Sequence, residues 1–211
     1  MNPKLTKSYM SLTNARLPAS RNSGFSLITT MILLVVVTIL GIGAAQIVLQ
    51  SEKSTRYGRD FQIAFQAAEA ALLDAEFDIR GPNLSSKART TSTFAAGSAM
   101  GFVDGCGTGD QRGLCTPSAA GQKPIWYQVN FQDISDGAHT VRFGEFTGRM
   151  FSTGDSGIRP EIAPRYIIEI IQDPTPGGNA SSRPTLYRVT AMGFGPRKST
   201  QAVTQMILRK E

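Results

Sequence analysis

The sequence is poor in the residues from which catalytic and metal sites are built. It contains one histidine, His139, and two cysteines among 211 residues. Two thiols and one imidazole cannot complete a tetrahedral zinc site by themselves. No zinc-protease, phosphate-loop, dinucleotide-binding or EF-hand pattern occurs in the chain. The sequence therefore favours a protein with no catalytic residues, no cofactor and no bound metal.

Beyond residue 24 the chain also carries little net charge. The formal net charge is +6, and four of these charges belong to Lys4, Lys7, Arg16 and Arg21 in residues 1–24, which contain no acid. The rest of the chain carries only +2, which gives little field to attract a polyanion. No basic stretch is interleaved with aromatic residues, as a single-strand binder requires. We predict no nucleic-acid partner.

Charged side chains are absent between Arg21 and Glu52, and residues 25–49 are almost wholly apolar. As a helix these 25 residues would extend about 37 Å, which exceeds the roughly 30 Å hydrocarbon core of a bilayer. The basic N-terminal flank predicts a cytoplasmic N-terminus and a periplasmic C-terminal part. A cleavable signal peptide ending near residues 43–45 and a generic single-pass anchor are the alternatives.

Proline is absent from residue 51 to residue 79, and helix-forming residues dominate that stretch. We expect one helix over residues 25–80, with residues 25–49 in the membrane and residues 50–80 amphipathic. Arg80, Gly81 and Pro82 form a stop signal. The stripe predicted to pack on a sheet consists of Phe61, Ala64, Phe65, Ala68, Leu72 and Ala75.

The remainder of the chain divides at residue 124. Residues 81–124 are rich in Gly, Ser and Thr and predict a long loop, and Cys106 and Cys115 within it predict a disulfide outside the cytoplasm. Residues 125–211 predict an antiparallel sheet of four or five strands, the last two joined as a hairpin by GPRKS. The predicted fold class is α+β. The predicted strands are 125–131, 139–143, 165–171, 186–194 and 200–208.

The junction RNSGFSL, residues 21–27, resembles the processing site of a type IV prepilin. The resemblance implies that a prepilin peptidase cuts between Gly24 and Phe25 and that Phe25 becomes N-methylated. The segment GRDFQIAFQAAEAALLDAE, residues 58–76, resembles PilX-type minor pilins, as do the late runs PRYIIEII and YRVTAMGFG. The fold implied is a long N-terminal helix packed on a C-terminal sheet.

That resemblance implies a structural subunit which supports pilus assembly, twitching motility and adhesion. The expected partners are other minor and major pilins, the prepilin peptidase, the inner-membrane assembly platform and, before assembly, membrane lipid. Thr29 stands where most pilins carry a glutamate. By analogy with tip subunits of related pseudopili, this departure places the subunit at or near a filament tip. Glu69 is a candidate for contacts between subunits.

Three alternatives remain at this stage. The first is a tip adhesin whose 81–124 loop and sheet contact a surface. The second is a pseudopilin of a type II secretion system, and the third is a membrane-tethered periplasmic enzyme. Loss of filaments on deletion favours the assembly subunit. Filaments that are present but fail to adhere favour the adhesin, and normal filaments with a metabolic defect favour the enzyme.

Overall fold

The computed structural model describes residues 25–89, 93–95, 98–154, 158–172 and 185–210. The chain divides into two compact units, residues 1–51 and residues 52–211, and one helix begins in the first and ends in the second. The elements, in order, are α1 (Phe25–Arg80), η1 (Gly109–Gln111), β1 (Leu114–Cys115), α2 (Ile125–Gln128), β2 (Val141–Arg142), β3 (Arg165–Gln172), β4 (Thr185–Phe194) and β5 (Gln201–Arg209).

Helix α1 ends where the stop signal predicted. Gly81 takes φ +69°, a conformation that glycine adopts without a steric cost, and its N–H donates to the carbonyl of Phe77 at 2.7 Å. The ammonium of Lys210, just beyond β5, donates to the carbonyl of Ile79 at 2.8 Å. The end of the helix is therefore held both by its own cap and by the end of the last strand.

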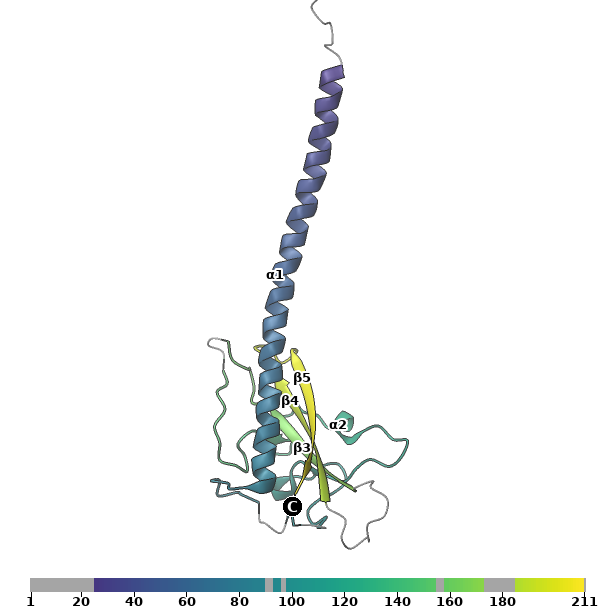
Figure 1. Cartoon of the computed structure of the whole chain (residues 1–211). Helices are drawn as coiled ribbons and strands as arrows, with labels where there is room; N and C mark the ends of the chain where they lie inside the picture. The colour runs from purple at the N-terminus through teal and green to yellow at the C-terminus, as the bar shows by residue number, and fades with distance from the viewer. Residues whose placement is uncertain (1–24, 90–92, 96–97, 155–157, 173–184, 211) are drawn as a thin grey trace, which may run out of the picture. The chain divides into compact units, whose positions relative to one another are not determined.

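The sheet contains five strands in the order β1-β3-β4-β5, and β2 also pairs with β3 (Figure 1). Strands β3, β4 and β5 form an antiparallel meander, with Ile168 opposite Val189 and Val189 opposite Met206. The predicted GPRKS hairpin is confirmed, since β4 and β5 pair from Leu186 opposite Arg209 to Phe194 opposite Gln201. Strand β1 joins β3 in parallel. The predicted α+β class is confirmed, and the sheet is mostly antiparallel.

Two of the predicted strands are wrong in whole or in part. Residues 125–131 do not form a strand, because Pro124 leads into the short helix α2, which buries only Ile125. Alternation over so few residues does not separate a strand from a helical turn. Of residues 139–143 only Val141 and Arg142 pair with β3, and the chain then turns at Gly144. A Cβ there would lie 1.9 Å from a backbone oxygen, so the turn requires glycine.

The second half of α1 lies against the inner face of the sheet, beside β3, β4 and β5 (Figure 1). The closest approach is at Gly193 of β4, where a Cβ would lie 2.0 Å from the carbonyl oxygen of Ala64. Only small helix residues fit there, and Ala64, Ala67 and Ala68 are buried. The core then widens around Leu72, Ile79, Tyr166, Ile168, Tyr187 and Val189.

The predicted helix stripe needs one correction. Its alanines and Leu72 are buried as expected, but Phe61 and Phe65 keep 41% and 42% of their surface exposed. The helix approaches β4 so closely that bulky rings do not fit between them and lie to the side instead. Burial of apolar area is therefore supplied mainly by small residues in this part of α1.

Part of the outer face of the sheet is covered by the loop that carries the two cysteines. The predicted disulfide between Cys106 and Cys115 is present, and both residues are fully buried. They pack with Ile125, Phe131, Ile167 and Phe194 in a second core. The Gly-rich loop of residues 98–124 is thus tied to the sheet by β1, by the disulfide and by these contacts.

Candidate functional site

The first candidate region is the start of α1. Residues 25–49 are exposed, apart from partly buried Gly43, and the helix contains an uncharged window with a mean hydropathy of 2.7. By length and composition this segment is able to cross a membrane. No residue of that apolar window is buried against the described part of the chain.

The hydroxyl of Thr29 is already engaged inside this segment. Its Oγ1 donates to the carbonyl of Phe25 at 2.9 Å, and Thr30 makes the equivalent bond to Leu27 at 2.9 Å. Such bonds allow a hydroxyl to lie in an apolar environment without an unsatisfied donor. Position 29 is therefore neutral and internally satisfied, in contrast to a glutamate. Phe25 is the first residue of α1, whereas Gly24 lies outside the described residues.

Glu69 lies on the exposed side of α1. Residues four positions away along a helix are surface neighbours, and here these are Phe65 and Leu73, both exposed. The structure gives Glu69 no hydrogen bond or ion pair with any described residue. The role of Glu69 in contacts between subunits stays a prediction.

Two acids of α1 that the sequence analysis does not single out, Asp74 and Asp78, connect the helix to the rest of the domain by hydrogen bonds. The carboxylate of Asp74 accepts bonds from the Gly144 N–H at 2.7 Å and from the Thr147 hydroxyl. The carboxylate of Asp78 accepts a bond from the Tyr166 hydroxyl at 3.0 Å. Burial raises the pKa of both groups. Their four-residue spacing on the alanine-rich side of the helix was the only signal in the sequence.

Asp78 also faces a buried cation. The Arg89 guanidinium lies 3.5 Å from its carboxylate and stacks over the Phe146 ring, 3.8 Å from the ring centre. Desolvation outweighs the Arg89 charge and the Tyr166 bond and raises the pKa of Asp78 to about 6. This cluster fastens residues of the loop after α1, of β3 and of the 141–147 segment to the helix.

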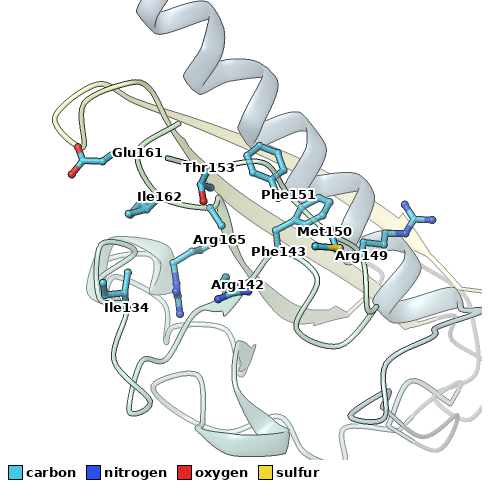
Figure 2. Close-up of a pocket in the computed structure, with 11 residues that line it drawn as sticks. Ile134, Arg142, Phe143, Arg149, Met150, Phe151, Thr153, Glu161, Ile162 and Arg165 are labelled. Carbon is cyan, nitrogen blue, oxygen red and sulfur yellow. The ribbon is translucent and has the colours of Figure 1, made fainter. Parts of the chain in front are cut away.

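A cavity of about 390 Å³ lies in the unit that contains the sheet (Figure 2). Arg165, at the start of β3, is only 3% exposed, and it donates through Nε to the Thr140 hydroxyl and through Nη2 to the Thr140 carbonyl. No sequence signal pointed to this cavity. Its lining residues include the charged Arg142, Arg149, Glu161 and Arg165 and the apolar Phe143, Met150, Phe151 and Ile162.

No group of three or more metal-ligating side chains occurs among the residues that the structure describes. The Nδ1 atom of His139 is 3.0 Å from the carbonyl oxygen of Gly107. The features that stand out are an exposed apolar helix, a sheet that holds the second half of that helix, and a disulfide-tied loop.

A long, apolar N-terminal helix whose second half packs on a mostly antiparallel sheet defines the chain as a type IV pilin-like subunit. Two family models match it: PilX N-terminal over residues 23–73, and type IV pilus assembly protein PilX C-term over residues 111–210. The chain belongs to the PilX family, whose members are structural pilus components. No curated protein and no solved structure gives a significant match.

Proposed function

We propose that this protein is a minor pilin that primes assembly of a type IV pilus and lies at or near the filament tip. The observation that carries the proposal is the start of α1, where an exposed apolar helix has a neutral, internally bonded Thr29 in place of a carboxylate. A tip subunit has no subunit above it whose N-terminal ammonium needs neutralising. Roles in twitching motility and surface adhesion would follow from that position.

The life history that we propose begins in the inner membrane, with the N-terminus in the cytoplasm and the sheet in the periplasm. A prepilin peptidase cuts after Gly24 and methylates Phe25. The assembly platform then moves the helix from lipid into a bundle of pilin helices. Apolar side chains exchange acyl chains for neighbouring helices, so the transfer leaves little surface in water.

Small residues favour this exchange because they let helix backbones approach closely. Beside Gly41 and Gly43 there is open space, because apart from the adjacent backbone of α1 no described atom lies within 4 Å of the position that a Cβ would take. In the membrane or the filament, helices of other minor and major pilins would occupy that space. Glu69, farther along α1, would contact a neighbouring subunit outside the bilayer.

The position of the subunit is tested by complementing a deletion strain with wild-type protein, Thr29→Glu or Thr30→Glu. We expect deletion to reduce or abolish surface pili and the wild-type protein to restore them. Thr29→Glu should spread the subunit along the shaft, as detected by immunogold labelling, because the carboxylate can pair with the next ammonium. Thr30→Glu is the matched control, since it places the same charge one position away.

Labelling that stays at the tip with Thr29→Glu would contradict the positional role of this residue. Normal pili in the deletion strain would contradict the assembly function itself. Pili that form normally but no longer adhere would instead support the tip-adhesin alternative.

A further inference from the structure

Two arginines face each other across neighbouring strands. Arg142 of β2 and Arg165 of β3 are direct partners in the antiparallel register. Side chains at such positions project to the same side of the sheet, with Cβ atoms about 5 Å apart, and like charges there repel each other. Both side chains line the cavity shown in Figure 2. This arrangement is unfavourable unless an anion lies between the guanidinium groups.

Within the described residues, no carboxylate lies within ion-pair distance of either arginine side chain. Neither arginine takes part in an ion pair there, although eight ion pairs form elsewhere in those segments. Two acids of this region have other partners. Glu145 pairs with Arg112 at 2.6 Å, and the carboxylate of Glu161 accepts the backbone N–H of Lys198 at 2.8 Å.

Burial makes the absence of a counter-charge more costly. Arg165 is almost fully buried, and its Nε and Nη2 donate to neutral acceptors of Thr140. Desolvation lowers the pKa of the Arg165 guanidinium, and the positive charges of Arg112 and Arg142 act in the same direction. The negative charges of Glu145 and Asp133 oppose this shift without reversing it. A guanidinium held in such a place normally has a carboxylate or phosphate partner.

The walls of the cavity indicate what the anion is attached to. Phe143 and Phe151 lie with ring centres 5.1 Å apart, and Met150 and Ile162 are further apolar lining residues. Figure 2 shows Phe143, Met150 and Phe151 on one side and Arg142 and Arg165 on the other, with Ile162 on the side of Arg165. The cavity of about 390 Å³ is large enough for a ring or a branched aliphatic group, which favours an anion with an apolar stem over an inorganic ion.

We propose that Arg142 and Arg165 bind a carboxylate that is carried on an apolar stem. The carboxylate lies between the two guanidinium groups, and its stem packs on the Phe143–Phe151 wall. Two sources share this chemistry: an acidic residue flanked by apolar residues in another pilus component, and a small aromatic or aliphatic acid. Only the first source rests on the proposed function.

The test uses the full chain in detergent micelles and isothermal titration calorimetry or NMR. The probes are phenylacetate and a blocked Phe-Glu-Phe tripeptide, each with a neutral counterpart, phenylacetamide and Phe-Gln-Phe. We expect at least one acid to bind and its neutral counterpart to bind roughly tenfold more weakly or not at all, because charge-assisted bonds are lost. Tighter binding of the tripeptide identifies a polypeptide as the source, and tighter binding of phenylacetate identifies a small acid.

Arg142→Gln is the main variant, because Arg142 is exposed and its side chain makes no hydrogen bond or ion pair within the described part of the chain. We expect it to weaken binding of the acid roughly tenfold or more. Arg209→Gln, another exposed strand arginine, should leave binding unchanged. Failure of both acids to bind, equal binding of acid and neutral probe, or full binding by Arg142→Gln would overturn the proposal. None of these outcomes depends on whether the protein assembles pili.

Discussion

Asp78 connects the chemistry of one residue to the pH dependence of the whole domain. Its folded-state pKa of about 6 lies above the ordinary value of 3.8. A raised folded-state pKa contributes stability that is fully present below pH 3.8 and is lost as the pH rises through 6. The difference in unfolding free energy between wild type and Asp78→Asn should therefore fall by up to about 3 kcal/mol from pH 4 to pH 7.5.

Chemical denaturation of the full chain in micelles at several pH values measures that difference. Tyr166→Phe is an informative companion, because the Tyr166 hydroxyl lowers the pKa of Asp78 by bonding to its carboxylate. Its removal should move the pH transition upward. A difference that grows with increasing pH would show that Asp78 is stabilised in its charged form, contrary to the burial argument.

At the residue scale, the sequence predicts those features whose partners lie nearby in the chain. The cysteines, nine positions apart, and the Arg80-Gly81-Pro82 stop signal are of this kind. The opposition of Arg142 and Arg165 depends on the pairing of β2 with β3, which joins residues that are distant in sequence. The partners of Asp78 are likewise brought together only by the fold. No local pattern carries such information.

At the scale of the element, the contact between α1 and β4 depends on the absence of one side chain. A Cβ at Gly193 would lie 2.0 Å from the Ala64 carbonyl oxygen and 2.3 Å from the Ala68 nitrogen. Both are backbone atoms, which cannot move aside as a flexible side chain can. Gly193→Ala should therefore lower the unfolding free energy by about 3 kcal/mol or more, at the upper end of overpacking costs.

Thermal unfolding followed by circular dichroism measures this effect. Gly137→Ala is the control, because a Cβ there meets only the Ser135 hydroxyl oxygen at 3.8 Å, an ordinary contact. Equal melting temperatures for the two variants would mean that the helix can move away from β4 without loss of stability. In that case close packing of α1 on β4 would not explain the small residues of the helix.

Length explains which elements the sequence predicts well. Strands β3, β4 and β5 have eight to ten residues each, and their alternation and turn signals mark them clearly. Strands β1 and β2 have two residues each, and α2 has four, so their patterns are too short to be read. The exposure of Phe61 and Phe65 is likewise not predicted by their helical spacing. That spacing does not reveal how closely a glycine of β4 lets the sheet approach the helix.

At the scale of the whole molecule, membership of the PilX family and an exposed apolar helix make the fate of the N-terminus the decisive question. We expect intact-mass and peptide mass spectrometry of protein from pili or membranes to find a mature chain that begins at Phe25 with one added N-methyl group. The physical reason is that cleavage before residue 25 preserves the apolar segment, whereas ordinary signal cleavage removes it.

The matched variants are Gly24→Val, which puts a branched side chain beside the scissile bond, and Ser23→Val, which puts the same group one residue earlier. We expect unprocessed protein from the first and processed protein from the second. The unprocessed chain would retain the basic leader and the membrane span, but it would not enter pili, because four positive charges would have to leave the cytoplasmic face with it. A mature chain beginning near Gln46 would remove the helix that the proposed assembly requires, and the pilin function would then have to be abandoned.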